Sequence, residues 1–346
     1  MKIQISKYPL YFKQAVGTSR GILKKKNTWF IKLSHSNSPE NFGLGEINMF
    51  EGLSSDYTPE FYSKLNEIEL NPQLYLYDIH ESLKTFPSIR FGLEMAMLDY
   101  KNQKNRILFP SEFTQEKEGI PINGLIWMGT KEFMLQQIKS KLDVGFRCLK
   151  MKIGAINFDE ELAILKSIRN EFKESDLELR VDANGGFNMS DALHKLQQLS
   201  NLQIHSIEQP IKQGQLKNMS SLCRNTPLPI ALDEELIGIN DIQKKAELLS
   251  QIKPQYIILK PALTGGFKAS QEWIDLAGKS NISWWITSAL ESNIGLSAIA
   301  QWAYQLNTNN YQGLGTGQLF TNNINSPLYI SGEKLFYSLS RKWADI

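Results

Sequence analysis

The sequence predicts an α/β fold, a (β/α)8-type barrel preceded by a smaller α+β domain. Eight short apolar runs recur after residue 122, each about one strand-plus-helix unit from the next. The stretches between them carry apolar residues at helical spacing. An open nucleotide-binding sheet would carry a Gly-rich GxGxxG turn after its first strand, and the first run here is not followed by one. A barrel is therefore the better prediction.

The first part of the chain, residues 1–113, reads as an α+β capping domain. Residues 3–12, 28–33 and 42–47 are strand-like runs. Helical patterns follow near residues 60–69 and 89–104. This order of strands and then helices is typical of an α+β unit.

Residues 114–318 are predicted to form the barrel. Its eight expected strands are residues 122–128, 146–153, 177–181, 204–207, 229–232, 256–259, 282–287 and 311–314. Residues 130–143, 158–172 and 190–200 are expected helices between them. The remaining residues, 319–346, are predicted to form a tail that packs back on the capping domain.

Composition excludes several classes of protein. The 346 residues carry 38 basic and 36 acidic side chains, a net charge of +2, which gives no reason to expect binding to nucleic acid or to an anionic membrane. The short basic run 24–26 is predicted to be a solvated loop.

Two cysteines, Cys148 and Cys223, are too few for a disulfide framework and suit a reducing cytosol. With no apolar segment of about 20 residues and no secretion signal at the start, a cytoplasmic location is expected. The oligomeric state is left open.

Five successive predicted strands end in charged residues. The second run ends with Lys150 and Lys152, which share one face because side chains alternate along a strand. The next four strand ends carry, in order, Asp182, Glu208, Asp233 and Lys260. Barrels place their functional groups at the C-terminal ends of the strands. The charged residues are therefore expected to meet in the barrel mouth.

Three carboxylates on adjacent strands would repel one another in a partly desolvated site. A divalent cation removes this conflict, and an all-oxygen ligand set points to Mg²⁺, with Mn²⁺ as a substitute, rather than to zinc. The chain has four histidines, and none stands at one of these strand ends. The sequence thus predicts a hard-cation site.

The lysines suggest proton transfer. Nearby positive charge and desolvation lower a lysine pKa, so that a neutral amine can act as a base. A carboxylate substrate held by the cation has a more acidic α-hydrogen, and the cation stabilises the charge left when that proton is removed. The expected partner is accordingly a small-molecule carboxylate.

These motifs resemble those of the enolase superfamily, in its muconate-lactonising-enzyme subgroup. The resemblance spans nearly the whole chain and implies an enolase-like fold: a capping domain, the barrel and a returning tail. The matching motifs are KMK at 150–152, DAN at 182–184, EQP at 208–210, DE at 233–234 and KP at 260–261.

The resemblance also implies roles for individual residues. The implied magnesium ligands are Asp182, Glu208 and Asp233. Lys152 would be the catalytic acid and base, with Lys150 as its electrostatic neighbour and Lys260 as the lysine on the opposite side of the substrate. Asn184 would contact the substrate carboxylate, and Glu234 would pair with Lys260.

Within the subgroup, segments 123–129, 288–295 and 313–319 are similar to those of the o-succinylbenzoate synthase family of menaquinone biosynthesis. That family dehydrates 2-succinyl-6-hydroxy-2,4-cyclohexadiene-1-carboxylate, so the resemblance implies a carbon–oxygen lyase. The alternative is an N-acylamino-acid racemase, or another cycloisomerase or epimerase of the subgroup. Dipeptide epimerases carry Asp-x-Asp at the eighth strand end, where this chain has residues Leu314-Gly315-Thr316. A Schiff-base aldolase, which needs no metal, and a non-catalytic barrel are more distant alternatives.

Several positions near the mouth stay open. Ser288 and Glu291 either bind substrate or cap the following helix. Glu235 is predicted to be a surface acid, and residues 19–21 form either a flap over the mouth or an ordinary loop. Three tryptophans are expected in the core: Trp127, Trp284 and Trp285.

Overall fold

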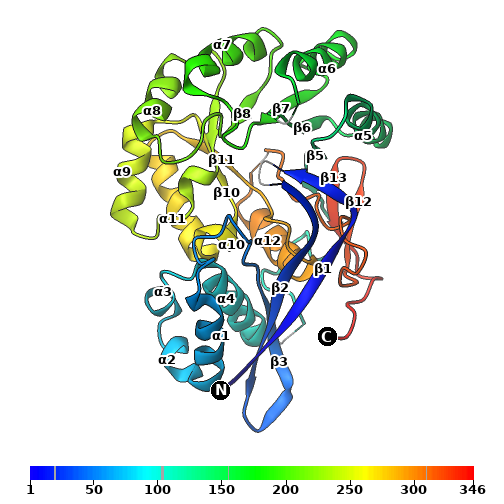
Figure 1. Cartoon of the computed structure of the whole chain (residues 1–346). Coiled ribbons are helices and arrows are strands. Elements are labelled where there is room, and N and C mark those ends of the chain that lie inside the picture. The colour runs from blue at the N-terminus through cyan, green and yellow to red at the C-terminus, as the bar shows by residue number, and fades with distance from the viewer. Residues whose placement is uncertain (19–20, 103–104, 155, 309) are drawn as a thin grey trace.

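The computed structural model describes residues 1–18, 21–102, 105–154, 156–308 and 310–346. Of the predicted flap, residues 19–20 therefore lie outside the described residues, and Gly21 begins a strand. Figure 1 shows the N-terminal strands and helices on one side of the molecule and an array of strands with outer helices on the other. No described helix is both long enough and apolar enough to cross a bilayer.

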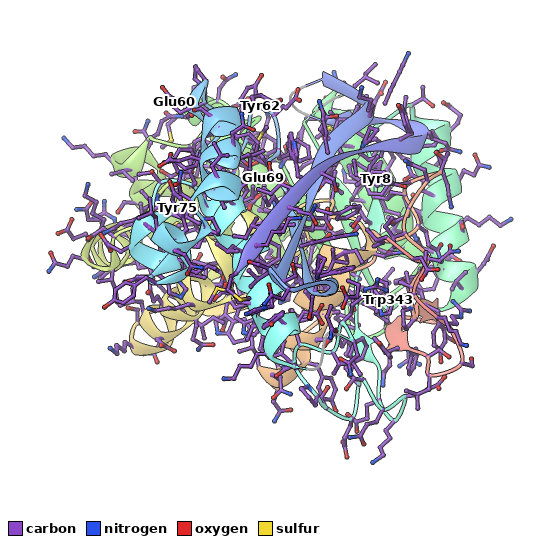
Figure 2. The ribbon with its side chains drawn as sticks, turned by 90° about the horizontal axis from the view of Figure 1, so that it is seen from below. Tyr8, Glu60, Tyr62, Glu69, Tyr75 and Trp343 are labelled. Carbon is purple, nitrogen blue, oxygen red and sulfur yellow. The ribbon has the colours of Figure 1, made fainter. Side chains whose placement is uncertain are left out.

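The chain opens with an antiparallel three-stranded sheet in the order β1-β2-β3. Its strands are β1 (Lys2–Thr18), β2 (Gly21–His35) and β3 (Ser38–Ile47). Four helices follow: α1 (Glu60–Leu70), α2 (Pro72–Leu76), α3 (Ile79–Ser82) and α4 (Pro87–Lys101). In Figure 2 the labelled Glu69 on α1 lies beside the β1–β2 ribbon, and its Oε1 accepts a hydrogen bond of 2.6 Å from Ile5 N. The predicted strands and both predicted helices of this part are present.

Helix α4 packs unusually close to β3 because both elements carry glycines at the contact. A Cβ on Gly45 would lie 1.9 Å from the carbonyl oxygen of Gly92, and one on Gly43 would lie 2.1 Å from that of Ala96. Only residues without a side chain allow such an approach. This contact fixes the end of β3, which reaches the functional site described below.

The predicted alternation of strands and helices is present from residue 120 onward. The strands are β4 (Ile120–Pro121), β5 (Gly124–Ile126), β6 (Cys148–Lys152), β7 (Glu178–Asp182), β8 (Ser206–Glu208), β9 (Ile230–Leu232), β10 (Tyr256–Leu259) and β11 (Ser283–Ile286). The helices are α5 (Lys131–Val144), α6 (Phe158–Glu171), α7 (Met189–Ser200), α8 (Leu216–Asn225), η1 (Glu234–Leu236), α9 (Ile242–Ile252), α10 (Pro261–Thr264), α11 (Gly266–Lys279) and α12 (Asn293–Gln305).

Strands β5 to β11 form one seven-stranded parallel sheet in chain order. In Figure 1 helices α5 to α9 lie on the outer side of this sheet. The sheet and its separate capping layer fit the predicted enolase-like architecture. Each strand is short and buried, and its apolar side chains join a continuous core with the helices. Parallel strands covered on both faces need such apolar runs.

The predicted eighth strand, residues 311–314, is not a strand in the structure. Gln312 and Gly313 instead form single parallel bridges to Ile122 and Thr287, next to the two edge strands β5 and β11. Backbone hydrogen bonds reach both edges, from Asn123 N to Gln312 O at 3.0 Å and from Gly313 N to Ile286 O at 2.8 Å. The segment therefore lies between the edges, but too few residues pair to form a strand.

The tail contacts two parts of the chain. Strands β12 (Leu328–Ser331) and β13 (Lys334–Tyr337) form a small sheet with β4. Phe320 bridges to Phe12 on β1, and Thr321 N donates to Tyr11 O at 2.8 Å. The tail thus touches the first sheet at these residues, while the division of the chain into a capping domain, a barrel and a tail at residues 113 and 318 stays a prediction.

One charged residue of the capping sheet departs from the prediction of a solvated basic loop. Residues 24–26 lie within β2, and Lys26 is only 8% exposed. Its ammonium group donates to Asn48 Oδ1, so the buried charge has a polar partner. Burial lowers the pKa of Lys26, and the charges of Glu46 and Glu291 oppose that effect. The prediction was wrong for this residue because its partners stand far along the chain.

Candidate active site

Parallel pairing aligns the predicted charged residues in one row. Lys152 stands opposite Asp182, which stands opposite Glu208 on the next strand. Asp233 directly follows β9, and Lys260 directly follows β10. The three acids are at most 2% exposed. The alternation of side chains and the parallel register therefore bring the row together at one end of the sheet.

Each lysine of the row contacts at least one of the acids. Lys150 Nζ lies 3.1 Å from Asp182 Oδ2 and also contacts Glu208 Oε2. Lys152 Nζ lies 2.9 Å from the same Asp182 oxygen. Lys260 Nζ contacts Asp233 Oδ2 and lies 3.6 Å from Glu208 Oε1. The ammonium groups therefore lie between neighbouring carboxylates.

This arrangement reverses the expected pKa shift of two lysines. Burial acts to lower the pKa of Lys150, but the charges of Asp182 and Glu208 outweigh it and raise the pKa. Burial is likewise outweighed at Lys260, whose pKa is raised chiefly by Asp233 and Glu208. The predicted lowering is wrong for these two groups, because the charges of the acids that contact each ammonium outweigh burial.

The same charges act on the acids. Burial alone would raise the pKa of Asp182, but Lys150, Lys152 and Lys260 outweigh it and hold the pKa well below its usual range. Asp182 therefore stays ionised at neutral pH and keeps both oxygens available as acceptors. An ionised, buried carboxylate is the form that binds a cation.

The oxygens of the three acids bear on whether a cation fits between them. Within the described part of the chain, no three metal-ligating side chains already surround a single point. Glu208 Oε1 nevertheless accepts no hydrogen bond from any described residue, although it is buried and faces Lys260. A buried oxygen without a donor is costly, and a cation between the acids would satisfy it. The all-oxygen donor set, with its free acceptor, fits a hard dication.

Asn184 and Glu234 extend the row on its open side. Asn184 has a left-handed backbone, with φ of 43°, and its Oδ1 accepts a hydrogen bond of 2.7 Å from Lys152 Nζ. Its Nδ2 donates to Glu234 Oε1 at 3.0 Å. Glu234 also contributes to the raised pKa of Lys260 through its charge. Asn184 is therefore the residue that joins the Lys152 and Glu234 sides of the mouth.

Glu235 is not the surface acid that the sequence predicted. It is 6% exposed, and its oxygens accept hydrogen bonds from Gln209 Nε2 at 3.0 Å and from Gly214 N at 2.9 Å. The short helix η1 turns its side chain toward the loop after β8. This acid therefore holds a loop in place beside the row.

The two predicted substrate-binding residues beyond β11 lie in different surroundings. Ser288 lines the cavity at the mouth, and its Oγ lies 2.6 Å from Thr316 Oγ1. Glu291 is fully buried outside the cavity lining, and its oxygens accept from Asn48 Nδ2 and Ala289 N. Neither caps α12, because Ser292 Oγ accepts from Ile294 N at its start.

The row opens into a cavity, whose empty space is about 830 Å³ when the open solvent at its mouth is included. Lys150, Lys152, Lys260, Asn184 and Glu234 line its polar side. Its other wall is largely apolar and comes from three separate segments: Phe50, Leu53, Leu125, Trp127, Ala289 and Leu290.

Sequence reasoning missed most of this apolar wall. Trp127 was expected in the core but lines the cavity, with its ring centre 6.0 Å from Lys152 Nζ. Its position at the end of an expected strand could have indicated that it lines the site. Phe50, Leu53 and Leu290 stand in loops whose positions only the tertiary structure defines, so no local pattern could have identified them.

Comparison with known proteins bears on this site. Residues 134–329 match the enolase C-terminal domain-like family. The o-succinylbenzoate synthase of Desulfotalea psychrophila is 45% identical over 96% of this chain and 98% of its own length. The crystal structure of MenC from the same organism superposes with a TM-score of 0.84, at 41% identity, over 97% of this chain and 99% of that one.

More distant structures share the fold. The dipeptide epimerase of Enterococcus faecalis, solved with Mg and the dipeptide L-Leu-L-Tyr, gives a TM-score of 0.82 at 20% identity, over 99% of this chain and 97% of that one. The muconate lactonizing enzyme of Pseudomonas putida gives 0.76 at 21% identity, over 99% and 94%.

Proposed function

Because the chain belongs to the enolase superfamily, in its muconate-lactonising-enzyme subgroup, we propose that it is the lyase that dehydrates 2-succinyl-6-hydroxy-2,4-cyclohexadiene-1-carboxylate to o-succinylbenzoate. This reaction belongs to menaquinone biosynthesis. The observation that carries the proposal is the row of lysines and acids at the strand ends, which opens into a cavity in a chain similar over its length to such a synthase.

The proposed cofactor is Mg²⁺, held by Asp182, Glu208 and Asp233, with Mn²⁺ as a substitute. When bound, the ion holds the substrate carboxylate and stabilises the negative charge that develops on it. Asp182, Glu208 and Asp233 would then have the ion as their partner in place of the ammonium groups that contact them here. We expect Lys150 and Lys260 to lose their raised pKa values once the acids have this other partner.

Lys152 is the proposed base and acid. Its amine takes the hydrogen from the ring carbon that carries the carboxylate, and the electrons of that C–H bond pass into the carboxylate as an enediolate. They then return to the ring as the C–O bond to the hydroxyl breaks. Lys152 gives the proton to the departing oxygen, so that water leaves and the ring becomes aromatic. One residue serves both steps because both groups lie on one face of the ring.

Lys260 lies at the opposite end of the acid row, in contact with Asp233, whereas Lys152 contacts Asp182. Its proposed role is to hold positive charge beside the enediolate on the other face of the substrate. Lys150 and Lys152 both contact the same oxygen, Asp182 Oδ2. The proposed role of Lys150 is electrostatic, through the positive charge that it holds beside Asp182 and Glu208.

N-acylamino-acid racemisation is the second candidate. Lysines on opposite sides of one cavity suit a reaction that removes a proton from one face and returns it to the other. Against a dipeptide substrate stands the segment Leu314-Gly315-Thr316, which has no carboxylate to bind an amino terminus. Dehydration is favoured because one base suffices for it.

The decisive measurement is turnover of the cyclohexadiene carboxylate in Mg²⁺ and in EDTA, beside racemisation of an N-succinylamino acid. We expect dehydration that EDTA abolishes and Mg²⁺ restores. Lys152→Ala is expected to lower kcat at least ~10²–10⁴-fold, the usual loss of a general acid or base. Lys139→Ala, an exposed lysine on α5, is the matched control and should leave kcat unchanged. Racemisation without dehydration would show that the second candidate is right.

A further inference from the structure

A buried polar cluster joins the capping sheet to the cavity wall. It consists of Lys26 on β2, Glu46 near the end of β3, Asn48 just beyond it, and Glu291 in the loop before α12. Lys26 is 8% exposed, and the other three are fully buried. The proposed reaction uses none of these four residues. A cluster of buried charges is costly unless it has a structural or functional role.

Asn48 is the centre of this cluster. Its Nδ2 donates to Ala289 O at 2.9 Å and to Glu291 Oε1 at 3.0 Å. Its Oδ1 accepts a hydrogen bond from Lys26. Both polar atoms of its amide are therefore used, and two of the three contacts reach the loop before α12. The capping sheet thus binds this loop through one side chain.

Leu290 stands between these two contacts and has a left-handed backbone, with φ of 61°. Such a conformation is unfavourable for a bulky residue and persists only where its surroundings impose it. Here Glu291 Oε2 accepts from Ala289 N at 2.7 Å, while Asn48 holds Ala289 O from the other side. Ala289 and Leu290 both line the cavity. The contacts of Asn48 and Glu291 therefore hold a strained segment of the cavity wall in place.

Alternate residues at the end of β3 and just beyond it bind successive parts of this region. Glu46 accepts hydrogen bonds at the start of α12, from Ser292 N at 2.9 Å and Gly295 N at 2.8 Å. Asn48, two residues on, holds the loop, and Phe50, two further on, lines the cavity itself. One segment of the capping domain thus places both the loop and its own aromatic ring against the substrate space.

We propose that Asn48 and Glu291 are positioning residues that hold Leu290 against the cavity and thereby set how tightly the apolar part of the substrate is bound. The proposal rests on the proposed function for the identity of the substrate. The hydrogen bonds of Asn48 join residues 26, 289 and 291, and none involves the lysines or acids of the strand-end row. We call the contacts of Asn48 and Glu291 with residues 289–291 the clamp. Its loss is therefore expected to act on substrate binding rather than on proton transfer.

The kinetic test uses Asn48→Ala, which removes both donor contacts. We expect KM for the cyclohexadiene carboxylate to rise about tenfold and kcat to change less than about threefold, because uniform binding is lost and the transition-state groups are intact. Asn27→Ala is the matched control: an asparagine on the same capping sheet whose side chain contacts Glu51 instead. It should leave both constants unchanged. Glu291→Gln, which keeps the size of the side chain, tests the same point if Asn48→Ala does not fold.

A double-mutant cycle with Leu290→Ala separates positioning from a general loss of structure. If Asn48 acts through Leu290, adding Asn48→Ala to Leu290→Ala raises KM by much less than tenfold. The proposal would be overturned if the KM increases of the two single variants multiply in the double variant. A fall in kcat with KM unchanged would also overturn it.

Hydrogen exchange of residues 288–292, measured without substrate, gives a readout that does not depend on the reaction. We expect faster exchange in Asn48→Ala than in the wild type or in Asn27→Ala. The amide of Ala289 donates to Glu291 Oε2, and Asn48 holds Glu291 in place through its other oxygen, Oε1. Unchanged exchange would refute the clamp whatever the substrate is. A wild type that does not dehydrate, with exchange faster in the variant, would instead refute the proposed function and leave the clamp standing.

Discussion

The substitution Asp233→Asn separates metal binding from folding. Asp233 is 2% exposed and contacts Lys260, and asparagine has nearly the same shape without the charge. Lys260 keeps Glu208 Oε1 at 3.6 Å as a second partner, so its buried charge is not left alone. A proposed cation site, by contrast, loses one of its three charged ligands. We therefore expect a folded protein whose response to Mg²⁺ is weakened.

The expected size follows from linkage. A ligand present at a hundred times its Kd stabilises the folded state by about 2.7 kcal/mol. If removal of one carboxylate raises Kd about a hundredfold, the upper end of the loss found for partners outside the ligand shell, the same Mg²⁺ concentration adds only about 0.4 kcal/mol. At roughly 2 °C per kcal/mol for a chain of this size, Mg²⁺ should raise Tm by about 5 °C in the wild type and by about 1 °C in the variant.

Thermal unfolding in EDTA and in Mg²⁺ measures both quantities. Glu235→Gln is the matched control, because this neighbouring buried acid binds Gln209 and Gly214 rather than the lysines. It is expected to lower Tm in EDTA and to keep the full Mg²⁺ shift. An Asp233→Asn protein that keeps the wild-type shift would show that Asp233 is no ligand. One that fails to fold in EDTA would show that its role is structural.

Three further predictions concern stability. Glu46→Ala leaves three donors without their buried acceptor: Ser292 N, Ser292 Oγ and Gly295 N. The free energy of unfolding, measured in urea, should fall by about 4 kcal/mol, and Tm should fall with it. Burial, helped by the charge of Glu46 against that of Lys26, raises the pKa of Glu291 from 4.5 to about 7. The folded state therefore binds the proton more tightly, and the free energy of unfolding should fall by about 3 kcal/mol as pH rises through this window, a slope that Glu291→Gln should lack. Gly265→Ala places a Cβ 1.7 Å from Arg90 Nη2 at a φ of 99° and should cost at least about 2 kcal/mol, whereas Gly278→Ala in α11, with open space around it, should be neutral or stabilising.

The strand-end row could be predicted because it follows from local rules. Alternation along β6 puts Lys150 and Lys152 on one face, and parallel pairing without register shift puts Asp182 beside Glu208. No knowledge of the tertiary structure is needed beyond the order of the strands. The same rules failed two residues after Asp233. The helix η1 begins at Glu234, so strand alternation no longer governs Glu235, which is buried.

Other features depend on contacts between distant segments. The burial of Lys26 requires Asn48, and the cavity wall requires Phe50 from the capping domain beside Leu290 from the other half of the chain. A single sequence contains the residues but not their proximity. The predicted eighth strand failed for a different reason. Gln312 and Gly313 have the composition of a strand end, but each pairs with a different edge, so neither neighbour extends the pairing.

The charge at the cavity mouth favours an order of binding. With every group ionised, four acids and three lysines give a net charge of −1. The groups counted are Asp182, Glu208, Asp233, Glu234, Lys150, Lys152 and Lys260. A negative mouth repels a dicarboxylate substrate and attracts a dication, whose binding would change the sum to +1 and reverse that preference. The ammonium groups that contact the acids in this structure would then have lost those partners to the cation. The acids and lysines are therefore coupled, because the carboxylates whose charges raise the pKa values of Lys150 and Lys260 include the proposed ligands of the cation.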